Sequence, residues 1–307
     1  MVSPSKILCP IDFSDFSLDA LRHGLMIARW YSARLTLFHV YQVSQPLPVE
    51  GTPGGVPVFV ATDPNQKTEE LRRFCAPLVE SSGQSVETVV RPGDAAKEIR
   101  NEADRVPFDL VILGTHGRSG FERLFLGSVT EKVLRSTRVP VLTIPPPVRA
   151  PASALYNTIL CALEFSPSSI RALEYALSLA QQSHARLILL HVIEDVLSDV
   201  AEQALSLGNV SVSEYYQHLE KDAAARLRAA LPDDARVWSR PEERVVKGRA
   251  YAEILKVVAD ERVDLVVMGV QGKGVVNRLM FGSTTHRVIR EAGCPVLTLH
   301  SGGVAGQ

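Results

Sequence analysis

The stretch ILCPIDFSDFSLDALRHGLMIARWYSARLTLFHV, residues 7–40, decides the fold of this chain. The runs at either end of this stretch, Lys6–Ile11 and Arg34–Val40, are almost continuously apolar, which is typical of strands covered on both faces. Between them, residues 17–32 repeat apolar side chains at helical spacing, with Ser14 or Ser17 available as N-cap. Strand, helix and strand in succession predict a parallel pair joined by a right-handed crossover.

The same pattern returns in the second half of the chain. Residues 159–192, ILCALEFSPSSIRALEYALSLAQQSHARLILLHV, align with 7–40 without a gap. Three later pairs of segments also match: 91–99 with 246–254, 108–117 with 263–272, and 139–144 with 294–299. An internal repeat of this length predicts two domains, 1–147 and 155–302, joined by the Pro/Ala-rich linker 148–154.

Further apolar runs complete each half. In the first half they are Val86–Val90, Leu110–Leu113 and Val141–Ile144, separated by helical patterns at 94–104 and 128–136. Alternating strands and helices predict an α/β fold. We expect two tandem doubly wound domains, each with a five-stranded parallel sheet in the order 3-2-1-4-5. Residues 43–65 are rich in Pro and Gly and predict an exposed loop, with a lid as the alternative.

Composition excludes several classes of protein. The chain has 307 residues, 46% hydrophobic and 22% charged, with net charge −1. This is typical of a soluble globular protein without a basic field for nucleic acid. No apolar run has the length of a bilayer span, and the N-terminus has no signal-peptide pattern, so we expect a cytoplasmic protein with no membrane partner. The four cysteines lack CxxC spacing, so no disulfide framework or zinc site is expected.

A glycine-rich loop is the strongest chemical signal. GTHGRSGFERLFLGS, residues 114–128, returns as GVQGKGVVNRLMFGS at 269–283. Glycines let backbone N–H groups approach an anion, and Gly127-Ser128 opens a helix with free N–H donors. Asp12 ends the first strand at the same sheet edge and suits a ribose hydroxyl, an adenine amine or a metal held by phosphates. The loop therefore predicts a nucleotide site, although a tight strand-to-helix turn also requires glycine. It matches neither the Walker A nor the Rossmann pattern.

These residues resemble a known family. G-x2-G-x9-G-[S/T], after an apolar strand and before VTEKVLRSTRVPVLTIP, resembles the nucleotide motif of the universal stress proteins. The opening ILCPIDFSDFSLDAL and the run LTLFHV resemble that family too. Because both halves share these features, the chain is similar to tandem universal stress proteins, whose domains have the adenine nucleotide alpha-hydrolase-like fold.

The resemblance implies a ligand and its contacts. The ligand is ATP, alone or with Mg²⁺ or Mn²⁺. In the first half, adenine and ribose fall on Pro10, Ile11 and Asp12, and the base also lies against Val40. Ribose and phosphates fall on Gly114, His116, Gly117, Arg118, Gly127, Ser128, Val129 and Thr130. The residue types themselves, apart from the resemblance, offer the hydroxyls of Ser128 and Thr130 as donors.

The second half carries a related set. It comprises Leu163, Glu164, Val192, Gly269, Gln271, Gly272, Lys273, Gly282, Ser283, Thr284 and Thr285. Three substitutions distinguish it, because Ala162, Glu164 and Gln271 replace Pro10, Asp12 and His116. The second site is therefore either a nucleotide site or a degenerate copy that only supports the fold.

The resemblance also implies a function. We expect an ATP-binding stress-response or signalling module without dedicated catalysis, since no Ser-His-Asp or Cys-His arrangement is evident. A slow ATPase and a nucleotide-independent adaptor are the alternatives. The two halves are expected to pair through their last strands, and two chains to form a homodimer. His39 and His191, at equivalent positions, are interpreted as hydrogen-bonded structural residues.

Overall fold

The computed structural model divides into two compact units. It describes residues 2–42, 62–117, 126–146, 156–194, 212–238, 241–270 and 282–300. One unit is Pro4–Val139, and the other combines Met1–Ser3 with Pro140–Gln307. The predicted linker 148–154 lies outside the described residues, and so does the predicted loop up to residue 61. The last two residues of the predicted loop, Pro64 and Asn65, begin a helix instead.

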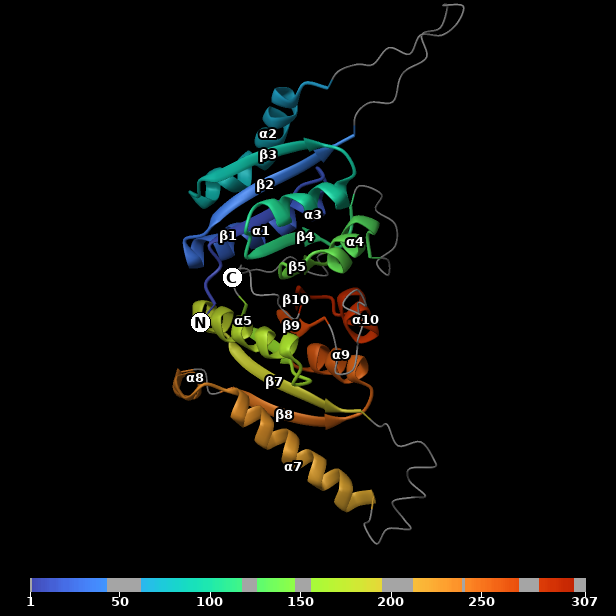
Figure 1. The fold of residues 1–307 in the computed structure, drawn as a ribbon. Helices are drawn as coiled ribbons and strands as arrows, with labels where there is room; N and C mark the ends of the chain where they lie inside the picture. The colour runs from blue at the N-terminus through green and yellow to red at the C-terminus, as the bar shows by residue number, and fades with distance from the viewer. Residues whose placement is uncertain are drawn as a thin grey trace, which may run out of the picture. The chain divides into compact units, whose positions relative to one another are not determined.

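The first unit alternates strands and helices throughout (Figure 1). Its elements are β1 (Lys6–Pro10), α1 (Asp15–Tyr31), β2 (Arg34–Tyr41), α2 (Pro64–Ser82), β3 (Val86–Pro92), α3 (Ala95–Arg105), β4 (Leu110–Gly114) and α4 (Ser128–Ser136). The strands lie in the order β3-β2-β1-β4, all parallel. Helix α1 packs beside α2, and α3 packs beside α4.

The second unit repeats this arrangement. It contains β5 (Val141–Ile144), β6 (Thr158–Ala162), α5 (Pro167–Ser183), β7 (Arg186–Ile193), α7 (Val212–Ala230), α8 (Asp233–Trp238), β8 (Glu242–Lys247), α9 (Ala250–Asp260), β9 (Leu265–Gly269), α10 (Ser283–Glu291) and β10 (Val296–Leu299). Strands β8-β7-β6-β9-β10 follow the predicted order 3-2-1-4-5. The predicted fold class is confirmed.

Strand β5 pairs with β10 in the antiparallel sense. Leu142 lies opposite Leu297, and Thr143 lies opposite Val296. The Thr143 hydroxyl donates to the Val296 carbonyl oxygen at 3.1 Å, and the Thr298 hydroxyl donates to that of Val141 at 3.2 Å. The last strands of the two sequence repeats therefore pair with each other, as the resemblance implies.

Two aspartate carboxylates accept hydrogen bonds from the backbone at the starts of neighbouring strands. Asp109 Oδ2 accepts hydrogen bonds from the backbone N–H groups of Ser5 at 2.7 Å and Lys6 at 3.0 Å. Asp264 Oδ2 accepts from those of Asn157 at 2.8 Å and Thr158 at 2.9 Å. Asp109 and Asp264, directly before β4 and β9, thus join the starts of these strands to the starts of β1 and β6.

Helix α2 is the main element of the first unit that the sequence did not predict. Pro77 lies inside it, where a missing N–H normally breaks a helix. Only Leu71 and Cys75 of this helix are buried, so its apolar periodicity is weak. An N-terminal cap compensates, because Asp63 Oδ1 accepts a hydrogen bond from Asn65 N at 2.8 Å.

All four cysteines are free and buried. Burial raises the pKa of the Cys75 and Cys294 thiols to about 12, and it raises those of Cys9 and Cys161 as well. They therefore remain protonated and pack as small apolar groups.

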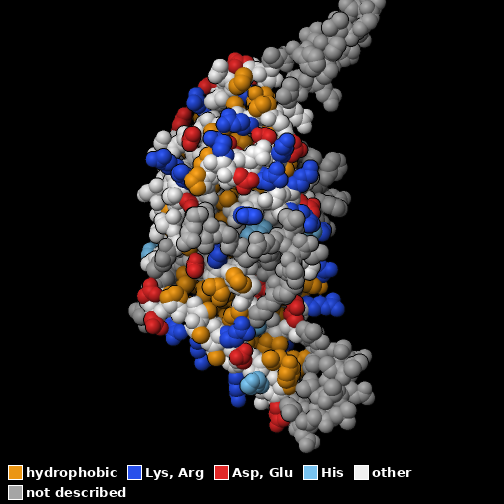
Figure 2. Space-filling view, viewed as in Figure 1, with side chains coloured by type: hydrophobic (Ala, Val, Ile, Leu, Met, Phe, Trp, Pro, Cys, Tyr) orange, Lys and Arg blue, Asp and Glu red, His pale blue; other side chains and the backbone are white. Residues whose placement is uncertain are grey.

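The described surface mixes charges of both signs. On the face in Figure 2, Lys and Arg side chains alternate with Asp and Glu, in keeping with the net charge of −1. Within the described residues, no helix has the length and hydropathy needed to cross a membrane.

Candidate functional site

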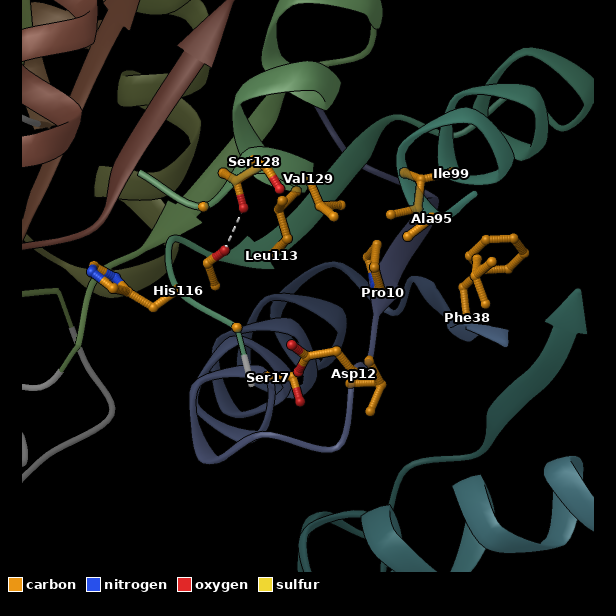
Figure 3. Close-up of a pocket in the computed structure, with 16 residues that line it drawn as sticks. Pro10, Asp12, Ser17, Phe38, Ala95, Ile99, Leu113, His116, Ser128 and Val129 are labelled. Carbon is orange, nitrogen blue, oxygen red and sulfur yellow. Dashed lines mark hydrogen bonds between the residues drawn. The ribbon is translucent and has the colours of Figure 1, made fainter. Parts of the chain in front are cut away.

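A cavity of about 350 Å³ opens at the carboxyl edge of the first unit's sheet, beside the ends of β1 and β4 (Figure 3). Of the residues proposed from the sequence, it is lined by Pro10, Ile11, Asp12, Val40, Gly114, His116, Gly117, Gly127, Ser128, Val129 and Thr130. The structure thus brings together residues from β1, β2, β4 and α4. Arg118 lies outside the described residues.

Asp12 presents one carboxylate oxygen to this cavity. Its Oδ1 accepts hydrogen bonds from the Ser14 backbone N–H at 3.1 Å and from the Ser14 hydroxyl at 2.5 Å. Its Oδ2 lies so close to Gly117 that a Cβ there would be 2.8 Å away. The carboxylate is therefore held through one oxygen, and the other is on the side of the glycine loop.

The glycines of the loop allow close backbone approach. Gly114 and Gly127 do not have positive φ angles. A Cβ on Gly114 would lie 3.1 Å from the Phe16 carbonyl oxygen, and one on Gly127 would lie 3.0 Å from that of Thr115. Both distances are shorter than ordinary contacts, so a side chain at either position would push the loop away from α1 or from the end of β4.

Helix α4 begins at the cavity without a side-chain cap. Its N-cap is Gly127, whereas Ser14, Asp63 and Asp94 cap α1, α2 and α3 through their side chains. The N–H groups of a first helical turn have no intrahelical acceptor, and the helix dipole favours an anion there. An anionic group in the cavity would meet these donors together with the exposed hydroxyl of Ser128.

Thr130 makes a hydrogen bond within the protein at the edge of the cavity. Its hydroxyl donates to the Gly114 carbonyl oxygen at 2.8 Å, and its side chain is buried. This hydrogen bond joins the end of β4 to the first turn of α4. In this structure the Thr130 proton is directed at the Gly114 carbonyl oxygen, and donation from this hydroxyl to a ligand stays a prediction.

His116 lines the cavity with its ring directed aside. Its Nδ1 lies 2.9 Å from the Thr115 hydroxyl, and its ring centroid is 5.7 Å from that of Phe16. In Figure 3 the imidazole points away from Asp12 and Ser128. Its contribution to the cavity is therefore mainly through its backbone.

The sequence reasoning missed five cavity residues: Ser17, Phe38, Ala95, Ile99 and Leu113. Ala95 and Ile99 come from the first turns of α3 and form an apolar wall with Val129 (Figure 3). The repeat of segment 91–99 could have identified Ala95 and Ile99, because the same residue types recur at Ala250 and Ile254.

The second unit contains hydrogen bonds equivalent to those that hold the backbone around this site. The Leu163 N–H donates to the Leu190 carbonyl oxygen at 2.8 Å, as that of Ile11 does to Phe38 at 2.8 Å. The Thr285 hydroxyl donates to the Gly269 carbonyl oxygen at 3.2 Å.

The remaining second-half residues follow the same plan. Glu164 Oε1 accepts from the Ser166 hydroxyl at 2.5 Å, which reproduces the contact between Asp12 and Ser14 despite the longer side chain. Val192 lies in β7, Gly282 caps α10, and Ser283 and Thr284 begin that helix. Three proposed residues, Gln271, Gly272 and Lys273, lie outside the described residues.

Comparison with known proteins decides the family. The family model described as "Universal stress protein family" matches residues 4–145 and again 155–300. The chain belongs to the universal stress protein family. Its two sequence repeats are tandem universal stress protein domains.

Individual universal stress proteins are similar to this chain in sequence or in structure. Universal stress protein MJ0531 of Methanocaldococcus jannaschii is 32% identical over 144 residues, which cover 46% of this chain and 82% of that protein. Universal stress protein Mb2028c of Mycobacterium bovis is 29% identical over 214 residues, covering 65% of this chain and 63% of that protein. The crystal structure of a universal stress protein from Archaeoglobus fulgidus has a TM-score of 0.64 at 22% identity, covering 97% of this chain and 98% of that chain.

Proposed function

We propose that the first repeat binds ATP in this cavity and that the protein is a nucleotide-dependent stress-response or signalling module without dedicated catalysis. One observation supports this most directly. A single cavity is lined by the Asp12 carboxylate, by the glycine-capped start of α4 and, to one side, by the apolar wall of Ala95, Ile99 and Val129. A nucleotide needs these three environments for its ribose, phosphates and base.

The ligand parts fit the residues present. Phosphates would bind the first-turn N–H groups of α4 and the Ser128 hydroxyl. Asp12 Oδ2 would accept from a ribose hydroxyl or the adenine amine. Ala95, Ile99 and Val40 would contact the base. The volume of about 350 Å³ is within the range of small-molecule sites.

A divalent cation would accompany the phosphates rather than sit in a protein cage. Among the described residues, no group of three or more His, Cys, Asp or Glu side chains could hold a metal ion. Asp12 alone would supply a protein carboxylate, so Mg²⁺ or Mn²⁺ would bind together with the nucleotide.

The second repeat is proposed as a weaker site of the same kind. Glu164 keeps the serine contact of Asp12, and Gly282 leaves α10 without a side-chain cap. The longer acidic side chain would leave less room for a ribose. Formation of a homodimer and location in the cytoplasm stay predictions from the sequence.

The test is a search for bound nucleotide followed by titration. The purified protein is denatured and any released nucleotide is identified, and then Mg-ATP is titrated by calorimetry. We expect ATP binding, with Asp12→Ala lowering the affinity about tenfold because it removes a charged hydrogen-bond acceptor. Glu164→Ala, the matched change in the other repeat, should leave the tighter site unchanged. No binding of Mg-ATP to the wild type would reject the proposal, and steady phosphate release lost in Asp12→Ala would favour an ATPase instead.

A further inference from the structure

A histidine fixes the peptide group that precedes Asp12. His39 lies in β2 with its side chain buried, and its Nδ1 donates to the Ile11 carbonyl oxygen at 2.7 Å. That carbonyl belongs to the peptide group that joins Ile11 to Asp12. Because the peptide group is planar, the hydrogen bond also fixes the direction in which the Asp12 N–Cα bond leaves β1.

The residue after Asp12 is restrained by the same histidine. Phe13 has a φ angle of 64°, in the left-handed region that few non-glycine residues occupy. Its ring centroid lies 4.4 Å from that of His39 and 5.2 Å from that of Phe74. Strained backbone of this kind persists only where the surroundings hold it, and such positions cluster at functional sites. Asp12 is thus restrained on both sides along the chain.

The second unit contains the same arrangement. His191 Nδ1 donates to the Leu163 carbonyl oxygen at 2.6 Å, which places the bond directly before Glu164. Phe165 has a φ angle of 63°, and its ring centroid lies 4.6 Å from that of His191.

The packing around the two aromatic rings is not the same. Phe74 contacts Phe13, whereas the Arg226 guanidinium lies 4.1 Å from the Phe165 ring centroid. The histidine contact to the main chain is therefore present in two different packing environments, and in both it precedes the acidic residue. The histidine contact thus goes with the acidic residue that follows it in the chain, and does not depend on which side chain packs against the phenylalanine.

We propose that His39 is a positioning residue that directs the Asp12 carboxylate into the ligand cavity, and that His191 does the same for Glu164. This rests on the proposed nucleotide site only for the identity of the ligand. The imidazole does not contact the ligand. It acts through the Ile11–Asp12 peptide group and through Phe13, while Ser14 holds Oδ1 of the carboxylate.

The first readout needs no ligand. In protein labelled with ¹³C at aspartate carboxyl carbons, Asp12→Asn identifies the Asp12 signal. We expect His39→Leu to move this signal and His39→Asn to restore it, because an asparagine amide can donate from the position of Nδ1. His39→Gln, whose amide reaches the position of Nε2, should behave like His39→Leu and serves if that variant folds poorly. His191→Leu is the matched control and should leave the signal in place. An Asp12 signal unchanged in both His39→Leu and His39→Gln would overturn the proposal.

The second readout is affinity for Mg-ATP. We expect His39→Leu to weaken binding about tenfold, and the double variant with Asp12→Ala to bind no more weakly than Asp12→Ala alone. A merely structural histidine would give additive losses and would not be rescued by asparagine, and either result would overturn the proposal. If the wild type does not bind Mg-ATP, the proposed function fails, and the Asp12 signal still decides the role of His39.

Discussion

At the scale of single residues, one missing side chain keeps Asp12 open to the cavity. A Cβ on Gly117 would lie 2.8 Å from Asp12 Oδ2. We expect Gly117→Ala to displace the carboxylate and to weaken Mg-ATP binding about tenfold, because a charged hydrogen bond to the ligand is lost. Calorimetric titration measures the affinity, and urea unfolding should show little change in the free energy of unfolding.

Gly83 is the control, because a side chain there would meet no neighbouring atom but would strain the backbone. It ends α2 with a φ of 65° and has no atom within 4 Å of a built Cβ. Gly83→Ala should lower the free energy of unfolding by about 1 kcal/mol through backbone strain, without changing affinity. Equal losses of affinity in both variants would show that Gly117 matters only for folding.

The residues of the candidate site differ in how far the sequence could place them. Asp12 and the glycines were predictable because each lies at the end of a strand or the start of a helix, where local pattern fixes its position. Ile99 was not, since it reaches the cavity only through the crossover from β3. The hydrogen bond of the Thr130 hydroxyl was not predictable from local pattern, because its acceptor, Gly114, belongs to a different element.

At the scale of elements, the second unit has an ion-pair network. The first repeat cannot form the same network, because it lacks two of the charged residues. The network joins β7, β8 and α9. Arg186 pairs with Glu242 and with Glu261, the latter at 2.7 Å, and Arg244 pairs with Glu242 at 2.5 Å and Glu261 at 2.6 Å. The first repeat has Val89 and Val106 where the second has Arg244 and Glu261. Hydrogen bonds from these arginines lower the pKa of both glutamates.

Acid should therefore weaken the second unit through this network. A lowered folded-state pKa gives stability that is present above the ordinary glutamate pKa and is lost as the pH falls through the folded value. We expect Glu261→Gln to be less stable than wild type at about pH 7, with the difference closing at about pH 3 and shrinking in high salt. Urea unfolding at each pH gives the free energies. Glu291→Gln, at the exposed end of α10, should show no such trend, and a Glu261→Gln difference independent of pH would contradict the network's role.

The elements themselves were largely predictable. The five strands predicted in the first half are confirmed with ends within two residues, because each is a short apolar run bounded by polar residues. Helix α2 was missed since its burial is confined to Leu71 and Cys75 and Pro77 interrupts its pattern. A helix that covers an edge strand needs few apolar residues, so its periodicity carries little information.

At the scale of the whole molecule, the sequence repeats and the compact units have different boundaries. Strand β5 belongs to the first repeat, yet it falls in the unit that begins at Pro140. Its pairing with β10 and the buried hydroxyls of Thr143 and Thr298 explain this placement. At the other end of the chain, the Ser178 hydroxyl donates to the Val2 carbonyl oxygen, so residues 1–3 also join the second unit. Local sequence could not predict this division, because it depends on contacts between distant segments.

The two tryptophans can test which unit β5 stabilises. Trp30 lies in α1 of the first unit and Trp238 ends α8 of the second, so Trp30→Phe and Trp238→Phe each leave one reporter. Leu142→Lys would bury a charge where Leu142 is 1% exposed opposite Leu297, at a cost of about 3 kcal/mol. In urea unfolding followed by fluorescence, we expect this substitution to shift the Trp238 transition to lower urea and to shift the Trp30 transition much less. Lys67→Leu on the surface of α2 is a control that should move neither by a comparable amount. A larger shift at Trp30 would mean that β5 stabilises the repeat to which it belongs in sequence, and that the antiparallel pairing contributes little to the second unit.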